Sequence, residues 1–320
     1  MSRKIPVFGI TVFVILALIG FVVGSQIVEY RVNTRPLVEG AAELTHFVLP
    51  EEDSISVLVV GDSGSGTRNQ YNVGIQMERR CRKKIPEAIL HVGDLVYPFG
   101  VKSVEDEQWE KKVFKPYSGK CLDQVPIFPV LGNHDYDGDV ASWLQMSERH
   151  PRWNYPSRHY SLEFPNIVTF YALDTQYPVN VREHGIPDFA EADTPWKIAY
   201  GHHPLTSQTA SGGGHKGVGV RGYLLKKLLC NRVDAYLAGH THSLEFDHID
   251  DCEMMHFISG AGGADIYPVR DDITAEFARA EYGFLELEFF PEKMNVRFFN
   301  LEGEQYHKQI AKDSSAEDDQ

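Results

Sequence analysis

The chain has 320 residues, of which 42% are hydrophobic and 12% aromatic, so it can bury a substantial core and is not disordered by composition. Its formal net charge of -14 at pH 7 repels the backbone of nucleic acids, and no basic stripe offsets that repulsion. We therefore expect no nucleic-acid partner.

The first segment is apolar. Residues 5–24 contain only Thr11 as a polar side chain and follow the basic pair Arg3-Lys4. With a rise of roughly 1.5 Å per residue, a helix of this length crosses a hydrocarbon layer of ~30 Å. The basic start predicts a cytoplasmic amino terminus and a domain in the periplasm, in a lumen or outside the cell. Because the run is longer than an ordinary signal core, we expect residues 1–25 to remain as a membrane anchor, with a cleaved signal peptide as the alternative.

Four cysteines are present, Cys81, Cys121, Cys230 and Cys252, and no CxxC pair supports a zinc ribbon. In an exported protein they can form disulfides in three connectivities. Cys230 and Cys252 flank two predicted strands and are the pair that we expect. Two buried thiols are the alternative.

Strand and helix signals alternate after a stalk at residues 26–50. Short apolar runs predict buried strands at 55–60, 88–92, 126–131, 196–200 and 235–238. Helical spacing joins Val73, Met77 and Cys81, a capping box opens a second helix at Ser103, and a third begins at Gly222. Hairpin patterns follow at 159–173 and 285–299. We expect one α/β domain over 51–305, with a mixed sheet inside, helices outside and an acidic tail at 306–320.

The first strand ends in GDSGSG, which has three familiar interpretations. A P-loop fails because Thr67 stands where the phosphate-binding lysine is needed, and a dinucleotide fingerprint fails because Asn69 replaces its third glycine. A nucleophilic Ser63 needs a base, and the Asp-x-x-His block that supplies it in GDSL esterases does not occur in the chain. The acid Asp62 is the remaining candidate.

Four further strand ends also carry glycine and polar residues. The five blocks are GDSG at Gly61, GDLVY at Gly93, GNHD at Gly132, GHHP at Gly201 and GHTH at Gly239. Ligands at the carboxyl ends of neighbouring strands converge on one crevice. Aspartates, an asparagine and histidines together suit Fe, Zn or Mn.

These five blocks in this order resemble the calcineurin-like metallophosphoesterase superfamily. Tyr97, three residues after Asp94, is similar to the tyrosine of the purple (tartrate-resistant type) acid phosphatases. FYALDT and ISGAGG extend the resemblance, which covers roughly residues 54–301. It implies a four-layer αββα sandwich of two mixed sheets flanked by helices.

The resemblance also implies a ligand set for two metal ions, Fe(III) and a divalent Fe, Zn or Mn. Fe(III) would be held by Asp62, Tyr97 and His242, the divalent ion by Asn133, His202 and His240, and Asp94 would bridge both. Anionic oxygen donors suit the trivalent ion, and imidazoles suit the divalent one. Taken singly, Asp62 is as easily a helix cap and Tyr97 a packed aromatic.

The implied activity is attack of a metal-activated hydroxide on a small phosphomonoester. His134 matches the histidine that binds the phosphate and protonates the leaving group, and His215 in SGGGHKG resembles a second such histidine. His203 is expected to line the pocket. One alternative is a phosphodiesterase or nucleotidase with two divalent ions and no ligation by Tyr97. The other is a non-catalytic binding module that retains the fold.

Overall fold

Two mixed β-sheets form the centre of the computed structural model, which describes residues 45–176, 189, 192–210, 219–249 and 251–312. These residues belong to one compact unit, Ala42–Gln320. The predicted membrane anchor, most of the stalk and His215 lie outside the described residues. Among the described residues, no helix is long and apolar enough to cross a membrane.

The first sheet has eight strands in the described chain and mixes parallel with antiparallel neighbours. In spatial order they are β1 (Thr45–Val48), β5 (Tyr160–Phe164), β6 (Val168–Ala172), β7 (Trp196–Tyr200), β8 (Ala235–Ala238), β10 (Met254–Ser259), β9 (Leu244–Ile249) and β11 (Phe277–Arg279). Strands β6, β7 and β8 run parallel, so their carboxyl ends point the same way.

The second sheet has six strands in the described chain. Their order is β14 (Glu304–Ala311), β13 (Lys293–Asn300), β12 (Gly283–Phe290), β2 (Ile55–Val60), β3 (Ala88–Val92) and β4 (Ile127–Val130). The first three are joined antiparallel, whereas β2, β3 and β4 run parallel. The predicted buried strands and both predicted hairpins are therefore confirmed.

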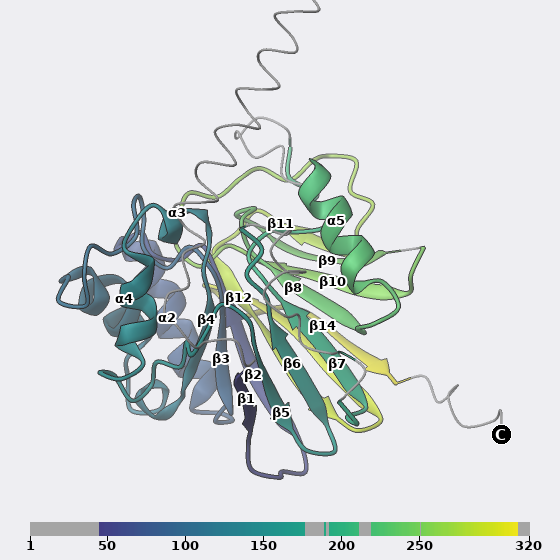
Figure 1. Cartoon of the computed structure of the whole chain (residues 1–320). Coiled ribbons are helices and arrows are strands. Elements are labelled where there is room, and N and C mark those ends of the chain that lie inside the picture. Colours follow the sequence, from purple (N-terminus) through teal and green to yellow (C-terminus); the bar gives the residue numbers. More distant parts are fainter. Residues whose placement is uncertain (1–44, 177–188, 190–191, 211–218, 250, 313–320) are drawn as a thin grey trace, which may run out of the picture. The chain divides into compact units, whose positions relative to one another are not determined.

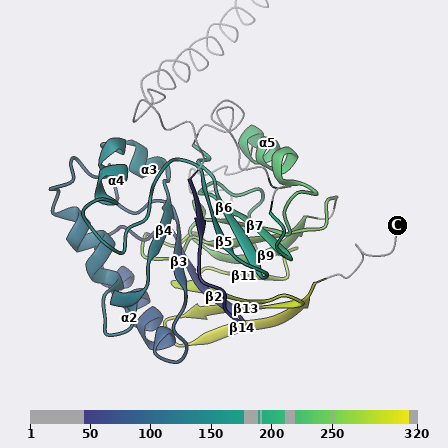
Figure 2. The same cartoon turned by 60° about the horizontal axis from the view of Figure 1, so that its bottom comes forward.

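Aromatic side chains pack the two sheets against each other. Phe289 of β12 lies 5.5 Å, ring to ring, from Phe170 of β6 and 6.0 Å from Trp196 of β7. Figure 2 shows the sheets as stacked layers, with β13 and β14 on the far side from β5–β7. The inner layers of the predicted αββα sandwich are thus confirmed.

Helices cover the outer faces of the sheets. Figure 1 shows α2 (Arg68–Cys81) and α4 (Val140–Met146) beside β2–β4, and α5 (Gly219–Leu229) beside β8 and β10. On α2 the predicted stripe of Val73, Met77 and Cys81 is fully buried. On α5, Leu225 and Leu229 pack into a cluster with residues of β6, β7 and β8.

The helix predicted from Ser103 instead begins at Trp109 and ends at Phe114. Asp106 is the reason, because its carboxylate accepts the N–H groups of Lys102 and Gln108 and holds that stretch in a turn.

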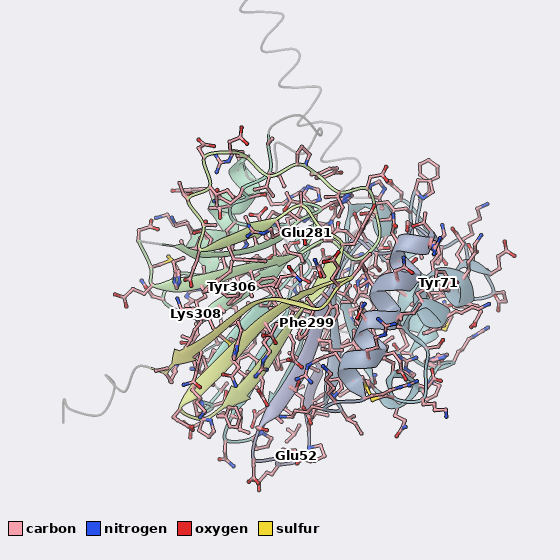
Figure 3. All side chains as sticks on the ribbon, turned by 180° about the vertical axis from the view of Figure 1, so that it is seen from behind. Glu52, Tyr71, Glu281, Phe299, Tyr306 and Lys308 are labelled. Atoms are coloured by element: carbon pink, nitrogen blue, oxygen red, sulfur yellow. A yellow bond between two sulfur atoms is a disulfide. The ribbon has the colours of Figure 1, made fainter. Side chains whose placement is uncertain are left out.

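The sheets extend beyond the 51–305 range expected for the domain: β1 lies before it, and β14 runs past its end. β1 pairs in parallel with β5, and β14 pairs with β13 along its length. Tyr306 and Lys308, labelled on β14 in Figure 3, both bond to the carboxylate of Glu276. The sheet therefore continues to Ala311, and only residues 313–320 of the expected acidic tail lie outside the described part.

All four cysteines form disulfides, Cys81–Cys121 and Cys230–Cys252. The second bond is the expected pair. The first joins the end of α2 to the turn before the short helix Leu122–Gln124. Two disulfides fit an extracytoplasmic location, where bonds of this kind form and persist.

Candidate metal centre

The five sequence blocks occupy the turns that directly follow β2, β3, β4, β7 and β8. Asp62 follows β2, Asp94 follows β3, and Asn133 opens the one-turn helix α3 (Asn133–Tyr136) after β4. His202 follows β7, and His240 follows β8. Because these strands are parallel within their sheets, the packed sheets bring the turns together.

The first donor group consists of Asp62, Tyr97 and His242. The phenol oxygen of Tyr97 lies 3.2 Å from Oδ1 of Asp62 and 3.1 Å from Nε2 of His242. Oδ1 of Asp62 and Nε2 of His242 are 3.5 Å apart. Three donor atoms from three separate segments therefore surround one point.

The second donor group consists of Asn133, His202 and His240. Oδ1 of Asn133 lies 3.2 Å from Nε2 of His202 and 3.0 Å from Nδ1 of His240. The two imidazole nitrogens are 3.2 Å apart. This is a second set of donors directed at one point.

Asp94 lies between the two groups. Its Oδ2 is 2.9 Å from the phenol oxygen of Tyr97 and 3.4 Å from Nε2 of His202. One carboxylate oxygen thus borders both donor groups, as a bridging ligand must.

The spacing of these donors fits metal coordination. Ligand bonds of about 2.0–2.2 Å at angles between 90° and 109° place neighbouring donors about 2.8–3.6 Å apart. The separations between the donor atoms, from 2.9 Å to 3.5 Å, fall in that range. The carboxylates, imidazoles, amide and phenol are also the donor types that iron, zinc and manganese accept.

The electrostatics of the centre also favour a cation. Burial raises the pKa of Tyr97 well above its normal value, and the Asp62 and Asp94 carboxylates raise it further. Burial lowers the pKa of His202, but the Asp94 carboxylate outweighs that effect and raises it to about 9. The side chains alone therefore hold a proton on His202 and on the phenol, and a bound cation would take the place of those protons.

Backbone groups orient three of the donor side chains, those of His202, His242 and Asp62. Nδ1 of His202 lies 2.9 Å from the Val92 carbonyl oxygen, and Nδ1 of His242 lies 2.5 Å from that of Asp265, so Nε2 of each ring faces the centre. Oδ2 of Asp62 accepts the N–H of His240 at 2.8 Å. Nε2 of each of these histidines and Oδ1 of Asp62 therefore remain available as donor atoms.

Glycine is required where the chain passes the two carboxylates. A Cβ on Gly132 would lie 2.2 Å from Oδ1 of Asp94, and one on Gly239 would lie 2.4 Å from Oδ2 of Asp62. Asp62, Asp94 and His240 themselves have positive φ angles of 52°, 54° and 67°. Strained backbone of this kind gathers at functional sites.

His134 lies at the edge of the donor groups. Its N–H donates to Oδ1 of Asp94 at 2.9 Å, and its Nδ1 lies 2.7 Å from the carbonyl oxygen of Pro98. Its ring packs 4.5 Å from that of Tyr97 and is partly exposed. This is the position that a residue contacting both the centre and a substrate needs.

Comparison with known proteins fits this geometry. Residues 55–244, more than half of the chain, match the family Calcineurin-like phosphoesterase. The chain belongs to this family. The prediction of a metal-dependent phosphoric-ester hydrolase with this fold is thereby confirmed, and its family implies a dinuclear metal centre.

Curated relatives of this phosphoesterase are acid phosphatases. Purple acid phosphatase 4 of Arabidopsis thaliana is 27% identical over 286 residues, which cover 80% of this chain and 83% of that protein. Tartrate-resistant acid phosphatase type 5 of Oryctolagus cuniculus is 28% identical over 316 residues, covering 85% and 92%.

Solved structures share the fold of this phosphoesterase. GAP50, described as the anchor in the inner membrane complex of Plasmodium, aligns with a TM-score of 0.71 at 20% identity over 83% of this chain and 91% of its own. Purple acid phosphatase PPD1 of yellow lupin aligns with a TM-score of 0.63 at 18% identity, over 83% and 55%.

The structure of this phosphoesterase also gives Ser63 a role different from those considered from sequence. Its Oγ lies 2.8 Å from Nε2 of His91, so a histidine partner does exist. Both residues are buried, with exposures of 0% and 1%, so no substrate reaches the hydroxyl. Burial lowers the pKa of His91 to about 3 and keeps the ring neutral. The pair joins β3 to the turn that carries Asp62.

Several supporting residues of this phosphoesterase were not identified from sequence. Asp135 accepts the N–H groups of Leu95, Val96 and Gly132, so it ties the Asp94 turn to α3. Its place in the GNHD block was an available signal. Tyr267 stacks on His242, with ring centres 4.1 Å apart, but no motif marks it.

Proposed function

We propose that the protein is an acid-phosphatase-like phosphomonoesterase with two metal ions. Fe(III) would be held by Asp62, Tyr97 and His242, and a divalent ion by Asn133, His202 and His240. The observation that carries the proposal is the position of Asp94 Oδ2. This oxygen lies 2.9 Å from the phenol oxygen of Tyr97 and 3.4 Å from Nε2 of His202. The similarity to purple acid phosphatases supports it.

The assignment of Fe(III) to the first group follows from its charge. Two carboxylates and a phenolate bring three negative charges to one point, which a trivalent ion compensates better than a divalent one. Because burial and the carboxylates oppose ionisation of Tyr97, only a strongly charged cation in contact with its oxygen makes the phenolate stable. The second group has only neutral donors besides Asp94, which suits a divalent ion.

When bound, the two ions supply an activated water as nucleophile and neutralise the phosphoryl oxygens. The chain itself supplies the proton for the leaving group. Because Nδ1 of His134 donates its hydrogen to the Pro98 carbonyl oxygen, Nε2 carries a proton only in the imidazolium form of the ring, and this form gives that proton to the departing alkoxide.

The test compares two nitrophenyl substrates on purified full-length protein in detergent. We expect p-nitrophenyl phosphate to be hydrolysed with a far higher kcat/KM than bis(p-nitrophenyl) phosphate. A preference for the diester, with two divalent ions and no iron, would instead support the phosphodiesterase or nucleotidase alternative.

We further propose that the catalytic domain is extracytoplasmic and held to the membrane by an uncleaved segment 1–25. The basic start and apolar run of the sequence support this topology, and the two disulfides support the compartment. Protein that stays in the membrane pellet after alkaline carbonate washing, with the domain open to external protease, is the expected result. Release of a shortened soluble chain would indicate a cleaved signal peptide.

A further inference from the structure

The dipeptide Asp174-Thr175 follows β6 and contacts the segments that carry His202 and Asn133. Both residues are buried, with exposures of 6% and 0%. Neither belongs to the five blocks, and neither is in a position to contact a substrate. Their contacts nevertheless reach two of the segments that supply the second donor group.

Thr175 holds the segment that carries His202. Its Oγ1 accepts the backbone N–H of His202 at 3.2 Å and that of His203 at 3.1 Å. The same oxygen lies 2.9 Å from Nδ1 of His203. A hydroxyl has two acceptor positions and one hydrogen, so with both positions filled the hydrogen goes to Nδ1 of His203. One side chain therefore fixes the backbone at both histidines and the ring of the second.

The end of β7 is packed directly on Thr175. A Cβ on Gly201 would lie 2.5 Å from Cγ2 of Thr175, so the glycine before His202 rests against that methyl group. The methyl and the hydroxyl of Thr175 thus set the distance and the direction from which His202 enters the centre.

Asp174 holds the segment that carries Asn133. Its Oδ2 accepts the O–H of Tyr136, the last residue of α3, and lies 3.5 Å from a guanidinium nitrogen of Arg158. Arg158 also lies over the ring of Tyr136, 5.5 Å from its centre. Since α3 has only four residues, fixing Tyr136 fixes Asn133 at its other end.

The first donor group is supported by other segments. The carbonyl oxygen of Tyr97 accepts a bond from Nζ of Lys112 at 2.6 Å, and His242 is held by the Asp265 carbonyl and the Tyr267 ring. A change at Thr175, whose hydroxyl accepts the N–H groups of His202 and His203, therefore disturbs the second group before the first.

We propose that Thr175, assisted by Asp174, is a positioning residue that sets the affinity of the second, divalent metal ion without affecting the first. This inference rests on the proposed function, because it takes Asn133, His202 and His240 as the ligands of that ion. On this inference, different supporting residues position the first and the second donor group.

The test uses full-length protein and two substitutions at one position. Thr175→Val replaces the hydroxyl with a methyl of similar size, and Thr175→Ser keeps the hydroxyl. Iron content, the visible absorbance of the Tyr97 phenolate and the dissociation constant for zinc are measured on each protein after removal of the divalent ion. We expect Thr175→Val to bind zinc roughly 10- to 100-fold more weakly, with iron and absorbance unchanged, and Thr175→Ser to bind it nearly as wild type does.

Zinc affinity unchanged in Thr175→Val, or loss of iron in parallel with zinc, would overturn the inference. If Thr175→Val fails to fold, Thr175→Ala decides, since it removes the same hydroxyl with a smaller side chain. The same selective weakening is expected, and an unchanged zinc affinity overturns the inference. A wild-type protein that binds neither ion overturns the proposed function itself, so the two failures are distinguishable.

Discussion

The phenol oxygen of Tyr97 lies 2.9 Å from Oδ2 of Asp94, three residues earlier in the chain. A tight turn after β3 makes this contact possible, and the carboxylate of Asp135 holds that turn by accepting the N–H groups of Leu95 and Val96. The turn places a phenol and a carboxylate at one point, where the packed sheets add Asp62 and His242.

Removal of the phenol oxygen tests its ligation. We expect Tyr97→Phe to fold normally, because the ring is retained, and to lose the visible charge-transfer band of an iron phenolate. Absorbance spectra and iron content measure this result. Tyr71→Phe is the control, since Tyr71 lies on α2 (Figure 3) and its exposed hydroxyl donates to the Lys111 carbonyl oxygen at 3.0 Å. A band that survives in Tyr97→Phe contradicts the assignment of iron to this group.

Replacement of His134 tests its role as a proton donor. His134→Ala should lower kcat about 10²- to 10⁴-fold on an alkyl phosphate, whose leaving group needs a proton, and much less on p-nitrophenyl phosphate. Rates on the two substrates give the comparison. His150→Ala, which removes a ring stacked on Phe114, is the control. An equal loss on both substrates would mean that His134 only binds the phosphate.

A side chain at Gly239 should damage the centre more than the fold. The added Cβ of Gly239→Ala would lie 2.4 Å from Oδ2 of Asp62 and 2.9 Å from the Val92 carbonyl oxygen, so the Asp62 carboxylate must move. We expect loss of iron from a protein that still shows a cooperative thermal transition. Full metal content in this variant would show that the turn yields without moving Asp62.

The acid stability of the domain should depend on Glu288. Burial raises the pKa of Glu288, but bonds from Lys84, Asn295 and Arg297 outweigh it and lower the pKa to about 2, below the ordinary 4.5. A depressed pKa stabilises the fold fully above the unfolded-state value, and this contribution is lost as the pH falls from about 4.5 towards 2. Glu288→Gln should therefore be less stable than wild type to urea at pH 7, and the difference should shrink below pH 4.5. A constant difference across this range would exclude the carboxylate charge as its cause.

The sequence predicted most of the strands and the candidate ligands, for a local reason. Buried strands such as 88–92 are apolar throughout, and their turns carry glycine and polar residues in adjacent positions. Supporting contacts could not be predicted in the same way. Thr175 acts on residues 27 and 28 positions away, and Tyr267, after β10, stacks on His242 in the turn before β9, so both roles exist only once the chain has folded.

Errors at the ends of elements have a similar origin. Residues 306–311 were expected to belong to the tail, yet they form most of β14 because β13 and Glu276 offer bonding partners. The residues of a capping box are present at Ser103 and Asp106. The Asp106 side chain, however, accepts the backbone N–H groups of Lys102 and Gln108, and the helix begins only at Trp109.

The central claim is that Asp94 joins two metal ions in one centre. Metal content per chain, measured by mass spectrometry on full-length wild type and Asp94→Ala, tests it most directly. We predict two ions per wild-type chain, at least one of them iron, and one ion or none in the variant. A wild-type protein that binds no metal after reconstitution, or a variant that keeps both ions, would contradict the account.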